Sequence, residues 1–375
     1  MAGRAVNGGL GSTEPRGAEA SARPAPERGK HRIERLAALL DEPLLVTSGV
    51  NVRWLTGLSS SNAAVLVDPD GDATLYTDFR YAQKAKALEG VRFQQTARAV
   101  IGELSNLLAG TTIWIEAHVL TVAANEQLRE GGVETIPRSS LVERLRAIKE
   151  PGELETMCEA AAISDRVFAA LADEQFTGCT ERELSWRVRE LFHEHGSSEL
   201  AFDTIVAAAE NGASPHADVR DVEIPANTLV TIDAGCRVDG YASDCTRTYS
   251  TGELPDQLAR AYEVCLEAQL TALEAYGPGV GGRHADAAAR DVITAAGLGE
   301  NFGHGVGHGI GLEVHELPVA RTESTDTLEP GNVISCEPGI YIPGLGGVRI
   351  EDMVLVTDDG RERLTQASKA LTTVR

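Results

Sequence analysis

Apolar positions recur along the first third of this chain with two different spacings. Ile33, Leu36 and Leu40 lie three or four residues apart, which predicts a helix beginning near His31. Short apolar runs bounded by Gly, Pro and Asp predict strands, with helical stripes between them. The predicted strands are 43–47, 63–67, 73–77, 111–116 and 133–136, and the predicted helices are 80–88, 100–108 and 122–129. This alternation predicts an α/β domain over residues 31–143.

A second pattern, of long helices and β-branched strands, begins after residue 143. We expect one long helix over 144–173, with Pro151 in its first turn, and a second helix that Thr180 and Glu183 open as a capping box. The remaining expected elements are a strand at 202–208, a hairpin at 228–250, helices at 255–275 and 285–296, and strands with Gly-rich turns in the last third. Residues 144–375 are therefore expected to form a second domain, of the α+β kind.

The first 30 residues differ from both domains. They consist mainly of Gly, Ala, Pro, Ser, Glu and Arg and contain almost no large apolar side chain. Such a segment buries too little surface to offset the entropy of ordering, so we expect a disordered tail over residues 1–30.

Net charge and cysteine spacing narrow the functional classes. The 375 residues carry 34 Lys and Arg against 56 Asp and Glu, a net charge of −22. Such a surface repels nucleic acid and anionic membranes, and no apolar run reaches the roughly 18 residues of a membrane span. Six cysteines without CxxC spacing fit neither a zinc site nor a disulfide framework. We therefore expect a cytoplasmic protein without nucleic-acid or membrane partners.

Residues 228–250 carry the first sign of chemistry. Asp239-Gly240 favours a tight hairpin turn, which pairs position i with position 479 − i and sets Asp233 opposite Thr246. Asp244 then lies on the same face as Asp233, roughly 7–8 Å away at Cα. Two carboxylates so close repel each other unless a cation lies between them. The alternative is two solvated aspartates on an exposed face.

Histidines and glutamates in the last third add to this pair. A Gly-rich segment, in which the backbone can approach a site closely, contains His304, His308 and His315. Glu337 and Glu351 interrupt apolar, strand-like runs, and a buried carboxylate needs a cation or hydrogen bonds. For Glu351 the alternative cation is Arg349, two residues earlier on the same strand face.

Together these positions supply four carboxylates and one imidazole, which suit borderline-hard divalent ions better than a structural zinc site does. The five residues are Asp233, Asp244, His308, Glu337 and Glu351. Two ions about 3.5–4 Å apart can share carboxylates and a bridging water, whose lowered pKa yields hydroxide near neutral pH. The sequence therefore predicts a hydrolase with two divalent ions, such as Mn²⁺, Co²⁺ or Zn²⁺.

The segments around these five residues resemble those of the pita-bread metallopeptidases, and within them the Xaa-Pro peptidases, aminopeptidase P and prolidase. The segments are IDAGCRVDGYASDCTRT, GHGIGLEVHE, SCEPGIYI and VRIED. The resemblance extends over residues 31–375 through SGVNVRWLTG, YTDFRY and RAIKEPGELE. It implies a creatinase/prolidase-like N-terminal α/β domain, a pita-bread catalytic domain, two ions per subunit, most often Mn²⁺, and a homodimer.

The resemblance also implies a role for each site residue. Asp233 resembles a ligand of one ion, and Asp244 and Glu351 resemble the carboxylates that bridge both. His308 resembles the single imidazole ligand, and Glu337 the ligand that also takes the proton from the bridging water. The histidines that orient the substrate and stabilise the tetrahedral intermediate are matched by His216, His304 and His315, and the supporting positions by Tyr341 and Arg349.

An Xaa-Pro peptidase is the function that this resemblance implies. We expect a metal-dependent exopeptidase that hydrolyses the N-terminal Xaa-Pro bond of peptides, an Xaa-Pro aminopeptidase; the alternative is an Xaa-Pro dipeptidase, prolidase. Methionine aminopeptidase lacks the preceding α/β domain, whereas creatinase and non-enzymatic pita-bread binding modules are expected to lack ligands that are present here. The expected partners are peptides with proline at the second position.

Overall fold

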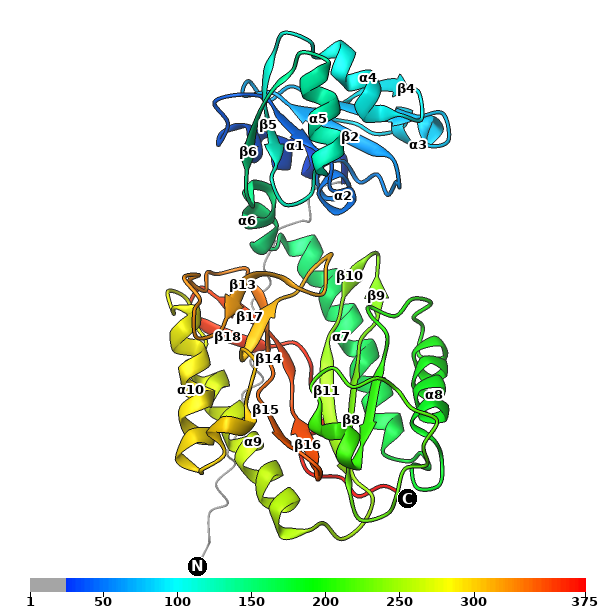
Figure 1. Ribbon diagram of the computed structural model, residues 1–375, viewed down its shortest axis with the longest axis vertical. Helices are drawn as coiled ribbons and strands as arrows, with labels where there is room; N and C mark the ends of the chain where they lie inside the picture. The colour runs from blue at the N-terminus through cyan, green and yellow to red at the C-terminus, as the bar shows by residue number, and fades with distance from the viewer. Residues whose placement is uncertain (1–24) are drawn as a thin grey trace, which may run out of the picture.

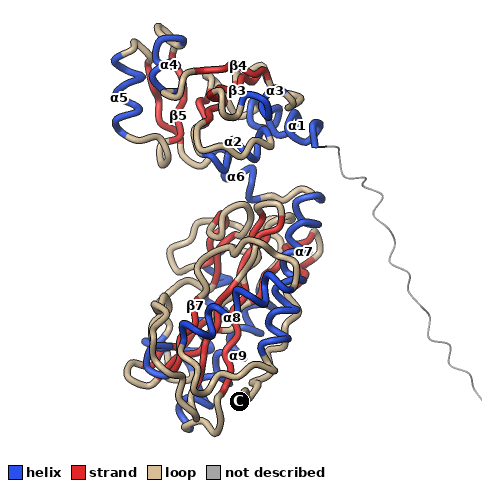
Figure 2. Tube along the Cα trace, turned by 90° about the vertical axis from the view of Figure 1, so that its right-hand side faces the viewer, coloured by secondary structure: helices blue, strands red, loops and turns tan. Residues whose placement is uncertain are grey.

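The computed structural model describes residues 25–375, which form two domains stacked along the long axis of the molecule (Figure 1, Figure 2). The first helix, α1 (Ala25–Ala37), starts within the stretch expected to be a disordered tail, so residues 25–30 are helical. The rest of that stretch, residues 1–24, lies outside the described residues. No helix among the described residues combines the length and the apolar character that crossing a membrane requires.

A mixed six-stranded sheet forms the centre of the first domain, in the order β4-β3-β2-β1-β5-β6. Leu44 and Val46 pack into one hydrophobic cluster and Leu45 into another, because successive side chains of a strand point to opposite faces. The central strands of the sheet are therefore buried on both sides. Its strands are β1 (Leu44–Val46), β2 (Ala63–Val67), β3 (Ala73–Asp78), β4 (Arg92–Thr96), β5 (Thr112–Glu116) and β6 (Glu134–Arg138).

Helices cover both faces of this sheet. Leu36 of α1 and Trp54 of α2 pack into the cluster of Leu44, whereas Leu104 of α4 and Leu128 of α5 pack into that of Leu45. The sequence pattern does not predict α2 or β4: Val50, Val52 and Trp54 of α2 alternate as in a strand, and β4 has only one large apolar residue, Phe93. The helices are α2 (Gly49–Thr56), α3 (Ala82–Lys86), α4 (Val100–Leu107) and α5 (Val122–Glu130).

Two helices, not one, connect the domains. α6 (Leu141–Ala147) ends three residues before α7 (Pro151–Leu171) starts, so the single helix expected over 144–173 is wrong. Proline disfavours the helical conformation in the residue before it, and Glu150 is extended, with ψ 158°. Glu150 also caps α7 through a capping box. The chain therefore turns at residues 148–150, where the two domains meet.

The second domain consists of two halves, and its strands lie between two pairs of helices (Figure 1). In one half α7 and α8 (Glu181–Glu194) pack on β7, β8 and β11. In the other half α9 (Asp256–Ala275) and α10 (Gly282–Ala295) pack on β14, β16 and β17. The strands are β7 (Ile205–Ala208), β8 (Leu229–Ala234), β9 (Arg237–Val238), β10 (Tyr241–Ala242), β11 (Cys245–Ser250), β12 (Gly307–Gly309), β13 (Glu316–Ala320), β14 (Val333–Cys336), β15 (Gly339–Ile342), β16 (Gly346–Arg349), β17 (Asp352–Thr357) and β18 (Gly360–Arg363).

The hairpin expected at 228–250 is confirmed in its register. Asp233 of β8 lies opposite Thr246 of β11, and the β9–β10 pair continues the same register to the turn. The two turn residues, Asp239 and Gly240, both have positive φ, 41° and 76°. Asp244 is two residues from Thr246, so Asp233 and Asp244 share one face.

Candidate functional site

One cavity of about 610 Å³ in the second domain brings the expected site residues together. All five expected metal ligands line it, as do Arg349 and the three histidines expected to meet the substrate. Tyr341 contacts this group from behind, with its hydroxyl 2.9 Å from Nε2 of His304. The cavity therefore gathers residues that the chain separates by more than a hundred positions.

Both halves of the second domain contribute to the cavity. The hairpin of the first half supplies Asp233, in β8, and Asp244, directly before β11. The second half supplies His308 in β12, Glu337 directly after β14 and Glu351 directly before β17. The backbone N–H of Glu351 donates to the carbonyl of Thr246 at 3.1 Å, which joins the halves beside the ligands.

Glycines around His308 allow the backbones to approach closely, as the sequence predicts. A Cβ at Gly307 would lie 2.0 Å from the carbonyl oxygen of Ser335, and one at Gly309 would lie 2.1 Å from that of Leu317. A Cβ at Gly311 would lie 2.5 Å from the carboxylate of Glu316. No other residue type fits these three positions without displacing backbone or a charged group.

The ring of His308 is oriented with one nitrogen toward the carboxylates. Its Nδ1 is 3.1 Å from the carbonyl oxygen of Gly309, which can only accept, so Nδ1 carries a hydrogen. Nε2 then faces Glu337 at 3.0 Å and Asp244 at 3.7 Å. Burial lowers the pKa of His308, but the hydrogen bond and charge of Glu337 outweigh it and raise the pKa. Nε2 is thus placed to hold either a proton or a metal ion.

Asp244 and Glu351 lie close together in this cavity and have no Arg or Lys ion-pair partner among the described residues. One ligand atom from each of Asp244, His308 and Glu351 lies within 4.8 Å of the others. Burial, then the charges of neighbouring carboxylates, raise the pKa values of Asp244 and Glu351 well above their ordinary range. Oδ1 of Asp233 and Oε1 of Glu351 are buried and have no hydrogen-bond partner among residues 25–375. This donor set fits divalent cations, because bound ions would satisfy both free oxygens and remove the repulsion.

Glu337 differs from these two carboxylates. Burial raises its pKa, but the hydrogen bond and charge of His308, with the charges of His304 and Arg349, lower the pKa to about 2. Ser335 also donates to its Oε1 at 3.0 Å. Glu337 is therefore ionised at neutral pH even without a metal ion.

Arg349 does not pair with Glu351, the alternative that the strand alternation leaves open. Its guanidinium instead binds Oδ2 of Asp233 at 2.7 Å and donates to the hydroxyl of Tyr341 at 3.0 Å. Glu351 accepts a hydrogen bond at Oε2 from the hydroxyl of Thr246 at 2.7 Å. Arg349 thus holds Asp233 in place, and Glu351 has no ion-pair partner within the part of the chain that the structure describes.

The three expected substrate histidines are not equivalent. Nδ1 of His304 donates to the carbonyl of Gly305 and its Nε2 meets Tyr341, so both nitrogens have protein partners. His315 and His216 are exposed to the cavity and form no hydrogen bond within the described part of the chain. Burial, then the charge of His308, lower the pKa of His315, so its ring is neutral at pH 7.

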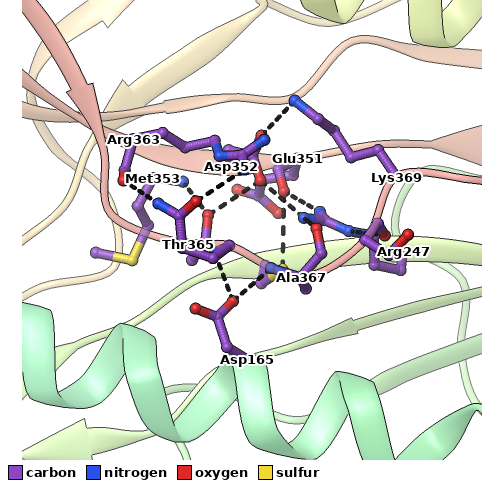
Figure 3. Close-up of polar contacts among 12 residues, drawn as sticks. Asp165, Arg247, Glu351, Asp352, Met353, Arg363, Thr365, Ala367 and Lys369 are labelled. Carbon is purple, nitrogen blue, oxygen red and sulfur yellow. Dashed lines mark hydrogen bonds and ion pairs between the residues drawn. The ribbon is translucent and has the colours of Figure 1, made fainter. Parts of the chain in front are cut away.

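A second buried ion cluster lies behind Glu351 (Figure 3). Asp352 has no exposed surface and binds Arg247 and Lys369, each at 2.8 Å. Thr365 and Gln269 donate to the same carboxylate at 3.1 and 3.0 Å. Arg247 also donates to the backbone carbonyl of Glu351. This cluster fixes the strand from which Glu351 projects.

Several of these contributors escape sequence reasoning. The roles of Arg247 and Asp352 depend on contacts with the C-terminal segment, which no local pattern predicts. Arg321, which lines the cavity directly after β13, stands alone in a polar stretch. The hairpin register sets Thr246 opposite Asp233 but predicts no function for it; its hydroxyl on the same strand face as the two aspartates is the signal that could identify it.

Comparison with known proteins identifies the family. Residues 155–358, more than half of the chain, match the metallopeptidase family M24, and residues 32–148 match the creatinase/prolidase N-terminal domain. The chain belongs to metallopeptidase family M24. This M24 chain is a hydrolase with a creatinase-like N-terminal domain and a pita-bread catalytic domain, as expected, and the family uses divalent metal ions.

Relatives of this M24 chain carry Xaa-Pro peptidase names. It is 36% identical to an Xaa-Pro dipeptidase of Pyrococcus furiosus, over 91% of this chain and 99% of that protein. The structure of an Xaa-Pro dipeptidase from Bacillus anthracis, 38% identical, superposes with a TM-score of 0.88 over 92% of this chain and all of that one. An X-Pro aminopeptidase structure from Thermotoga maritima is 30% identical, with a TM-score of 0.82 over 91% of this chain and all of that one. The alternative reading, dipeptidase, therefore fits these relatives better than aminopeptidase.

Proposed function

We propose that this protein is a metal-dependent Xaa-Pro dipeptidase. The observation that carries the proposal is the convergence of four carboxylates and one imidazole in one cavity, with free buried oxygens on Asp233 and Glu351. The dipeptidase names of relatives with 32–38% identity support the substrate class.

The five ligand residues would hold two divalent ions, for which Mn²⁺ is our first choice and Co²⁺ or Zn²⁺ the alternatives. Bound there, the ions would supply a Lewis acid for the scissile carbonyl and a water of lowered pKa. The free oxygens of Asp233 and Glu351 and the aimed Nε2 of His308 support this assignment. Arg349 keeps Asp233 in place from the opposite side.

The remaining side chains would bind the substrate and move its protons. The Glu337 carboxylate, ionised and held by Ser335, would take a proton from the attacking water and deliver it to the prolyl nitrogen as that nitrogen leaves. His315 and His216, with free ring nitrogens in the cavity, would donate to the developing oxyanion. His304 would act on the substrate through Tyr341 and Arg349, because both its nitrogens have protein partners.

Two properties of the cavity fit a dipeptide that ends in proline. Proline has no backbone N–H, so a site that bound this residue through strand-like hydrogen bonds would reject it. This cavity would instead bind the substrate through side chains. Arg321, 60% exposed, lies 3.9 Å from the exposed carboxylate of Glu323 and forms no ion pair with any of the five proposed ligand residues. We therefore propose that Arg321 receives the carboxylate of the dipeptide.

A set of matched peptides tests this function. The full chain, stripped of metal and then supplied with Mn²⁺, is assayed with Ala-Pro, Ala-Pro-Ala and Ala-Ala-Ala. Cleavage of Ala-Pro alone, and only with metal, is the expected result; cleavage of Ala-Pro-Ala as well would favour the aminopeptidase activity of the Thermotoga relative. No cleavage by protein shown to bind metal would contradict both.

Arg321→Ala sharpens the same test. We expect KM for Ala-Pro to rise, whereas Ala-Pro amide, which has no carboxylate, should be cleaved equally by both proteins. The homodimer and the cytoplasmic location stay predictions from the sequence, and light scattering on the full chain checks the first.

A further inference from the structure

A buried ion cluster lies directly behind the loop that carries His315. The Glu316 side chain, 4% exposed, forms ion pairs with Arg146 and, at 3.2 Å, with Lys149. Both cations are buried as well, with side chains 2% and 1% exposed. Arg146 belongs to α6 and Lys149 to the three residues after it, so both lie in the connection between the domains. Glu316 therefore fastens the His315 loop to that connection.

The Glu316 carboxylate also organises the loop from within. Its Oε1 accepts the backbone N–H of Glu313 at 3.0 Å. The backbone at Gly311 runs against the same carboxylate, where a Cβ would clash at 2.5 Å. In the β12–β13 pair Glu316 lies opposite Gly309, the residue after His308. A shift of this carboxylate would thus move the whole turn between His308 and His315.

The cluster continues into the first domain. Arg146 donates to Oδ1 of Asn51 at 2.7 Å, and the fully buried Asn51 donates to Glu116 at 2.7 Å and to Glu143 at 2.6 Å. Glu116, at the end of β5, accepts the backbone N–H of Thr47 after β1. Helix α6 lies between this sheet and β13 and contacts β13 (Figure 1). A continuous chain of hydrogen bonds therefore runs from the first domain's sheet to Glu316, the residue next to His315.

The His315 ring has few contacts of its own to hold it in place. Its ring packs against that of His308, with centroids 4.3 Å apart, but forms no hydrogen bond within the described residues. We propose that Glu316, held by Arg146 and Lys149, is a positioning residue through which the first domain sets the place of His315. The inference rests on the proposed function, because it assumes that His315 contacts the substrate.

Kinetics of the Mn²⁺-loaded full chain test this role. Glu316→Gln keeps the size of the side chain and removes its charge. We expect kcat for Ala-Pro to fall roughly 10- to 100-fold, the cost of a displacement of about 1 Å, while KM and metal content stay unchanged. The double variant Arg146→Met, Glu316→Gln should lose no more kcat than Glu316→Gln alone, because the two residues act together. Arg144→Met, which removes an exposed arginine from the same helix, is the matched control and should keep the wild-type kcat.

The position of the His315 ring can be followed without any catalysis. In metal-free protein with labelled histidine, a His315→Asn variant assigns the ring signals of His315. We expect those signals to move in Glu316→Gln and in Asn51→Ala, and to stay in place in Arg144→Met. Asn51→Ala should also lower kcat at unchanged KM, because it removes the link between Arg146 and the first domain.

A folded Glu316→Gln protein with wild-type kcat and unmoved His315 signals would overturn the proposal. If Glu316→Gln does not fold, kcat and the His315 signals of Asn51→Ala test the proposal instead. A wild-type protein that cleaves no Xaa-Pro peptide would remove the proposed function, yet the His315 signals would still support or refute the positioning by Glu316.

Discussion

Glu351 and Asp352 are neighbours in the chain and are equally buried, with 1% and 0% of their surface exposed, but they meet opposite surroundings. Asp352 lies against Arg247 and Lys369 and accepts two further hydrogen bonds (Figure 3). Glu351 has one hydroxyl donor, from Thr246, and a free Oε1 among other carboxylates.

The difference separates a structural ion cluster from a functional one. A buried carboxylate is tolerated when the chain supplies cations and donors around it, as it does for Asp352. Where the chain supplies too few, the carboxylate repels its neighbours until a cation arrives from solution, as for Glu351 and Asp244. Of these two adjacent residues, Asp352 thus receives its cations from the protein, whereas Glu351 requires one from solution.

The largest expected effect is on catalysis. Asp244→Asn removes the charge of a proposed metal ligand. Mutating a residue that only supports a metal ligand already costs up to about 100-fold, so kcat/KM for Ala-Pro with Mn²⁺ should fall by more than about 100-fold. Metal content, measured by elemental analysis, should fall with it. Asp358→Asn, an exposed site with no role in the cavity, is the control, and an active Asp244→Asn protein depleted of metal would refute the two-ion site.

The same change at the two neighbouring positions should have opposite effects on stability. Asp352→Asn leaves Arg247 and Lys369 buried without their carboxylate and should cost about 3–5 kcal/mol of unfolding free energy. Glu351→Gln relieves repulsion and should leave the metal-free protein as stable as before or more stable. Urea unfolding of both metal-free variants measures this, and equal losses would show that the comparison is mistaken.

Mn²⁺ should stabilise the folded protein only when the proposed metal ligands of the cavity are intact. Mn²⁺ at 100 times its Kd adds about 2.7 kcal/mol to the free energy of unfolding, because it binds only the folded state. The thermal midpoint should therefore rise with Mn²⁺ in wild-type protein and in Arg144→Met, and should not move in Asp244→Asn. A rise of the same size in Asp244→Asn would place the ion elsewhere.

The smallest expected effect is a dependence of stability on pH. The folded pKa values of Asp244 and Glu351 lie above their ordinary values of 3.8 and 4.5. The native state therefore holds protons that the unfolded state has lost, so their contribution to stability is lost as pH rises from about 4 through the folded pKa values. In metal-free protein the stability advantage of Asp244→Asn over wild type should grow with pH over this range. An advantage that is constant with pH would contradict the raised pKa of Asp244.

The sequence by itself determines those features that depend on neighbouring residues in the chain. The turn at Asp239-Gly240 and the alternation along each strand fix the register of the hairpin, and hence the shared face of Asp233 and Asp244. The break before Pro151 is equally local, and the rule for residues that precede proline predicts it where the apolar stripe alone does not. Of the proposed metal ligands, Glu337 and Glu351 follow from charges placed in apolar runs, and His308 from a Gly-rich segment.

Only the tertiary structure decides which partner each charge receives. Strand alternation allows Arg349 to pair with Glu351, but the packing of the two halves turns its guanidinium to Asp233. Asp352 and Glu316 each receive a cation from more than a hundred residues away in the chain, Arg247 of the hairpin and Arg146 between the domains. Hydrogen bonds and ion pairs act over a few ångströms in space, while periodicity and turn chemistry act over a few residues in sequence, so the sequence determines which residues carry charge and the fold determines whether each is neutralised.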